Sequence, residues 1–310
     1  MMTEGEHKQD RRRLLGGLAI GAVAGLAGAA AGAAAAHDAN AEPPPRIEGP
    51  KRFKDKVVLI TGGTSGIGRA SVIAFADEGA KVVFCGRRRP LGAEVEALAR
   101  SRGGSANYVY ADVRQEDSVK ALVAEVKRRH GRLDVAFNNA GVSVGAPLHE
   151  TSLSDFETVM DTNVRGVFLG LREQIPIMLE QGSGVILITS SVQAVATRPG
   201  SSAYSASKRG LLGLMQVAAL EYGSRGIRVN ALCPGTVDTP MVRDLGGATN
   251  MPDPAWAIAS RAWGRQNVPG MERMATADEM ARAALWLSSD EMSYLNGSAV
   301  LVDGGMTSAL

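Results

Sequence analysis

The sequence predicts an α/β fold, built as a single doubly wound domain around a seven-stranded parallel sheet. Short apolar runs alternate with longer segments, such as 118–130 and 203–222, whose apolar residues recur three and four positions apart. Most runs are continuous, which is typical of strands that helices cover on both faces. This strand–helix rhythm favours right-handed crossovers between parallel neighbours. The expected strands are residues 57–60, 81–85, 107–111, 133–137, 185–189, 227–233 and 299–302.

Composition excludes several classes of protein. The chain has 310 residues, of which 45% are apolar and 21% charged, as in ordinary soluble domains. Its formal charge of +2 gives no basic field of the kind that binds nucleic acid. Cys85 and Cys233 lie far apart, each at the end of an apolar run, so we expect buried free thiols rather than a disulfide framework. The histidines and cysteines have no metal-ligand spacing, and no metal site is expected.

The first 41 residues resemble a twin-arginine export signal. Arg11, Arg12 and Arg13 precede a stretch, 14–36, that carries no charge and consists mostly of Ala, Gly, Leu and Val. Small residues near position 41 fit a cleavage site, so we expect export, in a bacterium to the periplasm. The alternatives are an uncleaved membrane anchor and a cytoplasmic protein with a disordered tail. Residues 42–50 contain four prolines and predict a stiff linker before a domain at 51–310.

The first expected strand leads directly into TGGTSGIG, residues 61–68. A phosphate-binding turn needs glycine at the tight bend, where the backbone approaches a pyrophosphate, and where helix packs on strand. Gly62, Gly66 and Gly68 fit these three roles, and the amides that open the next helix would point at the anion. A strand, this turn and a helix in order predict a Rossmann-type dinucleotide site, which also includes Thr64, Ser65 and Ile67.

The end of the second expected strand bears on which dinucleotide binds. An acidic residue there would bind the ribose 2′-hydroxyl of NAD, but the sequence has Gly86 followed by Arg87. A guanidinium can hold a 2′-phosphate in a fork, so NADP(H) is favoured and NAD(H) remains possible. The alternative is that the arginines 87–89 form only a solvated turn. Asp112, with Val113 beside it, ends the third strand and is expected either to receive the adenine amino group or to cap its loop.

A tyrosine and a lysine predict the chemistry. In YSASK, Tyr204 and Lys208 are four residues apart and therefore share a helix face. A neighbouring ammonium favours the phenolate and lowers the tyrosine pKa, which makes the phenol a usable acid and base. Ser191 follows a strand thirteen residues before Tyr204, at the sheet edge where α/β proteins bind ligands, and could hold the reacting oxygen. Asn163 is expected either to be a structural hydrogen bonder or to hold a water in a proton chain.

Six motifs in this order, TGGTSGIG, NNAG, the Asn of DTNVRG, Ser191, YSASK and PGTVDTP, resemble the short-chain dehydrogenase/reductase family over residues 51–307. The resemblance implies a catalytic tetrad of Asn163, Ser191, Tyr204 and Lys208, with Tyr204 as acid/base and Asn163 holding a relay water. Lys208 would also bind the nicotinamide ribose. NNAG (138–141) would border the cofactor, as would the residues after the sixth strand. Those cofactor residues are Asn139, Ala140, Gly141, Pro234, Gly235, Val237 and Thr239.

The resemblance implies an NAD(P)-dependent oxidoreductase that interconverts a secondary alcohol and a ketone, working as a homotetramer or homodimer. The alternative is a dinucleotide-binding redox sensor or scaffold, which would not need a tuned phenol. The substrate is expected near residues 240–274, where Trp256 and Trp263 either form a water-excluding lid or pack that lid onto the body. His149 and Glu150 either line the pocket or lie in a solvated loop.

Overall fold

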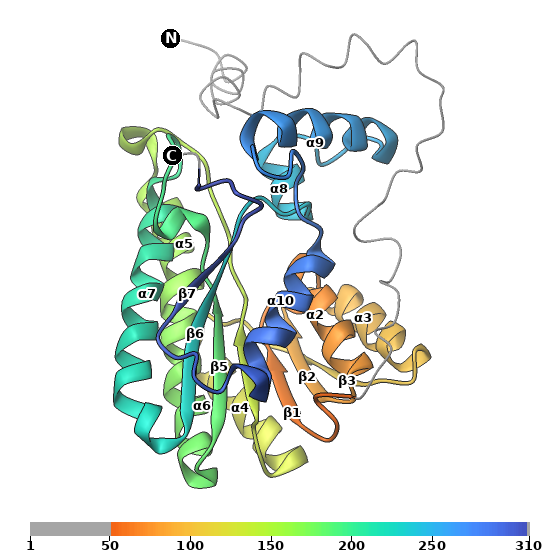
Figure 1. Ribbon diagram of the computed structural model, residues 1–310, viewed down its shortest axis with the longest axis vertical. Coiled ribbons are helices and arrows are strands. Elements are labelled where there is room, and N and C mark those ends of the chain that lie inside the picture. The colour runs from red at the N-terminus through yellow and green to blue at the C-terminus, as the bar shows by residue number, and fades with distance from the viewer. Residues whose placement is uncertain (1–50, 309–310) are drawn as a thin grey trace.

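The structure is a computed structural model that describes residues 51–308 (Figure 1). The expected export signal (1–41), the linker (42–50) and the last two residues of the chain lie outside these described residues. The strands form one parallel sheet in the order β3-β2-β1-β4-β5-β6-β7, which confirms the predicted fold class. They are β1 Val57–Ile60, β2 Lys81–Gly86, β3 Ser105–Tyr110, β4 Val135–Asn138, β5 Gly184–Thr189, β6 Ile227–Pro234 and β7 Ala299–Val302.

The strand boundaries agree with expectation to within two residues, and they coincide with it for β1 and β7. All four residues of β1 are buried, and its apolar run marks both ends. By contrast β3 is an edge strand with several half-exposed positions, and it begins at Ser105, two residues before the apolar run that predicted it. β4 begins at Val135 rather than at residue 133. An apolar run therefore locates a strand, whereas the ends of the strand follow from its backbone pairing with the neighbouring strands.

Helices cover both faces of the sheet (Figure 1). Apolar side chains of α4, α6 and α7 pack on one face, and those of α2, α3 and α10 pack on the other. Along β1, Val57 and Leu59 belong to the first cluster, whereas Val58 and Ile60 belong to the second. This alternation explains why the strand is apolar throughout. The helices are α2 Gly66–Asp77, α3 Arg89–Ser101, α4 Glu116–His130, α6 Gly166–Gln181, α7 Ser202–Tyr222 and α10 Ala277–Ser288.

Helix α5 (Leu153–Met160) runs into α6 through one π-helical turn, η3, at Asp161–Arg165. Helices α8 (Pro240–Leu245) and α9 (Asp253–Asn267) lie beyond the carboxyl ends of the strands (Figure 1). They enclose a small apolar cluster of their own, separate from the two cores on the sheet. The short 3₁₀ turns are η2 Leu148–Glu150, η4 Val192–Ala194, η5 Gly223–Arg225 and η6 Asp290–Met292.

Cys85 and Cys233 are buried free thiols, as predicted. Among the described helices, none combines the length and the apolar character that a bilayer crossing requires.

Candidate active site

A cavity of about 830 Å³ opens at the carboxyl ends of the strands. It lies where the strand order reverses between β1 and β4, the point at which doubly wound sheets bind ligands. The structure brings the sequence-predicted cofactor residues to this cavity, together with Ser191, with the exception of Asn138. These residues are Gly62, Thr64, Ser65, Gly66, Ile67, Gly68, Arg87, Asp112, Val113, Asn139, Ala140, Gly141, Tyr204, Lys208, Pro234, Gly235, Val237 and Thr239.

The glycine turn after β1 leaves no space for side chains. Gly62 has φ +69°, a left-handed conformation that favours glycine, and a Cβ on it would lie 2.8 Å from Ala140 Cα. A Cβ on Gly68 would lie 2.1 Å from the Gly62 carbonyl oxygen. Because α2 begins at Gly66, its first amides face the cavity as an anion site. The backbone thus forms a cradle that fits a pyrophosphate.

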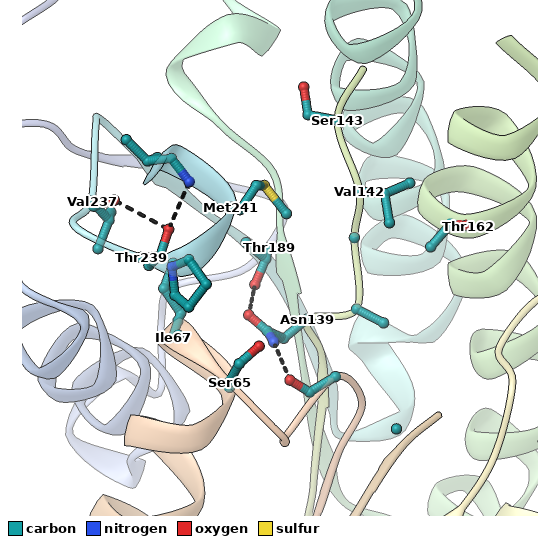
Figure 2. Close-up of a pocket in the computed structure, with 18 of the residues that line it drawn as sticks. Ser65, Ile67, Asn139, Val142, Ser143, Thr162, Thr189, Val237, Thr239 and Met241 are labelled. Carbon is teal, nitrogen blue, oxygen red and sulfur yellow. Dashed lines mark hydrogen bonds between the residues drawn. The ribbon is translucent and has the colours of Figure 1, made fainter. Parts of the chain in front are cut away.

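Asn139 joins the glycine turn to the neighbouring strands. Its Nδ2 donates to the carbonyl oxygen of Thr61 at 3.1 Å. Its Oδ1 accepts from Thr189 Oγ1 at 3.1 Å (Figure 2). The preceding residue differs from expectation. Asn138 turns away from the cavity and forms a pair of hydrogen bonds with Gln174 at 2.9 and 3.0 Å. Within NNAG, therefore, the first asparagine is structural and only the last three residues line the cavity.

The adenosine end of the cavity combines a glycine with arginines. A Cβ at Gly86 would lie 2.7 Å from Thr64 Cγ2, so Thr64 fills the space that an acidic side chain would need. Arg87 lines the cavity from an exposed position. Arg88, which sequence reasoning did not single out, donates to Ser65 Oγ at 2.6 Å and to Thr64 Oγ1 at 3.2 Å. Arg89 instead stacks on Tyr110, 4.3 Å from the ring centroid.

Asp112 lines the cavity but its carboxylate is already engaged. Arg114 donates from Nε and Nη2 to both carboxylate oxygens, at 2.6 to 3.1 Å. These hydrogen bonds hold the pKa of Asp112 below its ordinary value. The backbone N–H of Asp112 also donates to Ser118 Oγ. The sequence predicts that Asp112 either caps its loop or receives the adenine amino group. The hydrogen bonds observed here are those of the loop cap.

Lys208 lines the cavity from α7 and is 3% exposed. Its Nζ donates to the carbonyl oxygen of Thr189 at 2.8 Å and stands 5.4 Å from the centroid of the Tyr204 ring. Burial lowers the pKa of Lys208 to about 8. Ser190, at the end of β5, fixes this part of α7 because its Oγ donates to the Lys208 carbonyl oxygen at 2.9 Å. Tyr204 and Lys208 therefore share one side of the helix, as their spacing predicts.

The phenol of Tyr204 faces opposing influences. Burial raises its pKa, whereas a hydrogen bond with Ser191 and the positive charge of Arg198 lower it. Ser191 is itself held, since its Oγ accepts from the Gln193 amide at 3.1 Å. Arg198 lies in the loop before α7, and nothing in the sequence pattern distinguishes it. The site therefore contains a second cation near the phenol that sequence reasoning missed.

Asn163 sits in the π-helical turn η3 and is fully buried, outside the cavity lining. Its Oδ1 accepts from the Val142 amide at 2.8 Å, while its Nδ2 donates to the Val142 carbonyl oxygen at 2.9 Å and to Ser207 Oγ at 3.0 Å. The side chain thus holds the segment after β4 against α7, so this geometry is that of a structural hydrogen bonder. A relay water at Asn163 stays a prediction.

The opposite end of the cavity is lined by α8 and by residues 142–145. Met241 and Leu245 supply apolar surface there (Figure 2 labels Met241). Trp256 and Trp263 pack within the cluster of α8 and α9 and do not line the cavity. Of the two expectations for these tryptophans, the packing role is the one observed. His149 is 81% exposed and also lies outside the cavity lining, as in a solvated loop.

The chain is similar to known oxidoreductases. A sequence profile described as Enoyl-(Acyl carrier protein) reductase matches residues 62–307. The 3β-hydroxysteroid dehydrogenase of Mediterraneibacter gnavus is 39% identical over 268 residues, which cover 83% of this chain and 96% of that protein. The 2,5-dichloro-2,5-cyclohexadiene-1,4-diol dehydrogenase of Sphingobium indicum is 41% identical over 254 residues, which cover 81% and 97%.

The crystal structure of levodione reductase matches with a TM-score of 0.78 at 38% sequence identity, over 84% of this chain and all of that one. Fold, cavity and relatives agree with the ordered motifs of the sequence. The chain therefore belongs to the short-chain dehydrogenase/reductase family and is an NAD(P)-dependent oxidoreductase that acts on alcohol and ketone groups.

Proposed function

We propose that this enzyme interconverts a neutral ring ketone and its secondary alcohol with NADP(H), and that Tyr204 is the acid/base. The observation that carries the proposal is the convergence of three groups at one end of the dinucleotide cavity. Ser191, Tyr204 and Lys208 all line the cavity, Ser191 lowers the pKa of Tyr204, and Lys208 Nζ lies 5.4 Å from the centroid of the tyrosine ring. A redox sensor would need the cavity but not this arrangement.

The residues present fit a nicotinamide dinucleotide, since the glycine turn lines the cavity and is packed so closely against backbone that Gly62 and Gly68 have no room for side chains. When bound, the cofactor supplies or accepts the hydride. Tyr204 gives a proton to the ketone oxygen in reduction and takes one from the alcohol in oxidation. Ser191 holds that oxygen beside the phenol and stabilises charge on it. The Lys208 ammonium stabilises the phenolate that reduction leaves behind.

The decisive experiment follows reduced-cofactor consumption by purified protein with a panel of ring ketones. Tyr204→Phe removes only the phenol oxygen and should lower kcat by about 10³-fold, because proton transfer would lack its donor. NADPH affinity, measured by fluorescence titration, should stay within about twofold of the native value. Native-like turnover by Tyr204→Phe would refute the proposed acid/base.

The preference for NADP(H) rests on the arginines at the adenosine end. Arg88 lies over Ser65 and Thr64, Arg87 lines the cavity, and Thr64 fills the space beside Gly86. A charged hydrogen bond to a phosphate contributes about 1.5–3 kcal/mol, so Arg87→Ala and Arg88→Ala should each weaken NADPH binding roughly tenfold or more. NADH binding should hardly change. Arg89→Ala, which loses only the contact with Tyr110, is the control. An unchanged NADPH/NADH ratio in both variants would contradict the proposal.

Two observations support a neutral ring substrate. Asp244 lines the cavity near apolar Met241 and Leu245, and its carboxylate would repel an anionic substrate. The two relatives described above act, by their names, on a hydroxysteroid and on a cyclohexadiene diol. Cyclic ketones should therefore give higher kcat/KM than keto acids of similar size. Asp244→Asn should narrow that difference, and a native preference for keto acids would refute the assignment.

The proposed homo-oligomer, a tetramer or dimer, is supported by exposed apolar side chains on α5, α6 and α7. Light scattering of the purified enzyme should give two or four times the monomer mass, and a monomer at micromolar concentration would contradict it. The exposed apolar side chains on these three helices are Leu153, Phe156, Phe168, Val217 and Leu220.

Export through the twin-arginine route is supported by the arginines of residues 11–13 and the uncharged stretch after them. The twin-arginine route carries proteins that have already folded with their cofactor bound. A dinucleotide enzyme would need such a route, because its cofactor is made in the cytoplasm. N-terminal sequencing of protein from the cell envelope should find a chain that begins near Glu42. An intact Met1 on protein found only in the cytosol would refute export.

A further inference from the structure

A polar network connects the loop after β6 with the two helices beyond the sheet. Asp238 lies in this loop between Val237 and Thr239, which both line the cavity. Its backbone N–H donates to the Ala275 carbonyl oxygen at 2.8 Å, which fixes the loop. Its Oδ1 accepts from Trp256 Nε1 of α9 at 2.8 Å and lies 3.7 Å from Arg243 Nε of α8. One carboxylate therefore contacts both helices.

Arg243 closes the network from α8. Its Nη1 donates to Asp253 Oδ1, at the start of α9, at 2.6 Å. Its guanidinium carbon stands 5.1 Å from the centroid of the Trp256 ring, within the range of a cation–π contact. Trp256 is 1% exposed, and the side chain of Arg243 is 15% exposed. Asp238 is 18% exposed, so water screens its contact with Arg243 only weakly, whereas Asp253 is 44% exposed and its ion pair with Arg243 is screened more.

The same short helix α8 presents other side chains to the cavity. Met241, Val242 and Leu245 line it, and they flank Arg243 in the sequence. A shift of α8 by a fraction of its width would therefore move the apolar wall on which a substrate rests. The glycine turn and Lys208 belong to the sheet side of the cavity.

We infer that Asp238, Arg243 and Trp256 are positioning residues that hold α8 against the substrate and thereby set the affinity for the ketone. The inference rests on the proposed function, because it assigns the α8 side of the cavity to the substrate. It predicts a selective effect: loss of the network should raise the KM for the ketone while chemistry and cofactor binding stay close to native.

The chain contains a matched control. Trp263 lies on the same helix and in the same cluster as Trp256, and it is 4% exposed. Its buried Nε1 has no hydrogen-bond partner among the described residues. Trp256→Phe and Trp263→Phe therefore remove equal volumes from one cluster, but only the first removes a hydrogen bond to Asp238. A merely structural role would make the two variants behave alike.

Steady-state kinetics and NADPH titration on both variants test the inference. Trp256→Phe should raise the KM for the ketone about tenfold, because it removes the hydrogen bond that joins α9 to Asp238 in the loop before α8. Its kcat and its NADPH dissociation constant should stay within about twofold of native. Trp263→Phe should be native-like in all three. Equal KM values for the two variants, or a Trp256→Phe defect confined to kcat or to cofactor binding, would overturn the inference.

Two further variants separate the parts of the network. Asp238→Asn keeps an acceptor for Trp256 but removes the charge opposite Arg243, whereas Arg243→Lys keeps the charge. The rise in KM should be larger for Asp238→Asn than for Arg243→Lys.

Amide hydrogen exchange gives a readout that needs no turnover. Amides of 240–267 should exchange faster in Trp256→Phe than in Trp263→Phe, with β1 unchanged. If native enzyme reduced no ketone, the proposed function would fail, while exchange would still decide whether the network holds α8. Equal exchange in the two variants would overturn that claim.

Discussion

The two sides of the cavity are built in different ways. On the cofactor side, backbone at the ends of β1, β4 and β5 forms the surface, and a Cβ at Gly68 would lie 2.1 Å from a carbonyl oxygen. On the substrate side, α8 and α9 stand outside the sheet, and side chains such as Asp238, Arg243 and Trp256 hold them in place. A backbone surface tolerates no added atoms, whereas a side-chain surface can be repacked. Substitutions on the cofactor side should therefore cause large losses of cofactor affinity. Substitutions on the substrate side should cause smaller, graded losses of substrate affinity.

The largest effect is expected from Gly68→Ala. The new methyl group would meet the Gly62 carbonyl oxygen and, at 2.6 Å, Asn139 Nδ2, so the phosphate cradle must distort. Such overpacking costs about 1–3 kcal/mol, and NADPH affinity should fall by roughly one to two powers of ten. Fluorescence titration measures the affinity and urea unfolding the stability.

Gly213→Ala on α7 is the control for that variant. Nothing lies within 4 Å of the Cβ position at Gly213, and alanine is the better helix former. This variant should gain about 0.5–1 kcal/mol of stability and keep native NADPH affinity. Native-like cofactor binding in Gly68→Ala would show that the turn can relax, and the contrast between the two sides would not hold.

A smaller effect, with a pH signature, is expected from Lys208→Met. The folded pKa of about 8 lies below the ordinary value of 10.5, so between these values the unfolded chain binds more protons than the folded one. The contribution of Lys208 to the free energy of unfolding therefore rises as pH increases from about 8 to about 10.5. At about pH 7 the buried ammonium opposes folding, and Lys208→Met should be more stable by about 1–3 kcal/mol while losing activity.

Urea unfolding at about pH 7 and about pH 10 tests this expectation, since the stability gap between Lys208→Met and native protein should narrow at the higher pH. A gap that widened with pH would mean that the folded protein holds the Lys208 proton more tightly than the unfolded chain does.

The smallest effect is expected from Met241→Ala. Met241 lines the cavity and is 37% exposed, so its loss should raise the KM for a ring ketone by about threefold to tenfold with little change in stability. Met271 lies outside the cavity lining and is 55% exposed, and Met271→Ala is the matched control. If Met241→Ala changed the NADPH affinity and left the KM for the ketone unchanged, α8 would have to be assigned to the cofactor side of the cavity.

The sequence predicts the cofactor side better than the substrate side, for a physical reason. Buried parallel strands require apolar side chains on both faces, and a pyrophosphate turn requires glycine, so residue type alone carries the signal at β1 and at Gly62. The hydrogen bond from Trp256 to Asp238 joins residues 18 positions apart on different elements. No residue pattern marks it, because it depends on how α9 docks.

Arg88 and Asn138 show the same limit at shorter range. The run of three arginines after β2 predicts a cation near the ribose, but only the docked turn shows that Arg88 is the one that reaches Ser65. NNAG predicts the segment beside the cofactor, yet the hydrogen bonds of Asn138 to Gln174 on α6 turn its side chain into the core. Side-chain direction at the end of a strand follows from partners that lie far away in the chain.

The π-helical turn at Asp161–Arg165 has a consequence for how the chain can change in length. A π turn holds more residues than an α turn, so deleting one residue from it would yield a continuous α-helix of the same path. The residues on either side would keep their faces, because the π turn already accommodates the extra residue. Leu153 and Phe156 would therefore stay at the surface that they now present, whereas Asn163, which lies inside the turn, would lose its contacts with Val142. A deletion at this point should leave the exposed apolar side chains of α5 in place and should disturb only the segment after β4 that Asn163 holds.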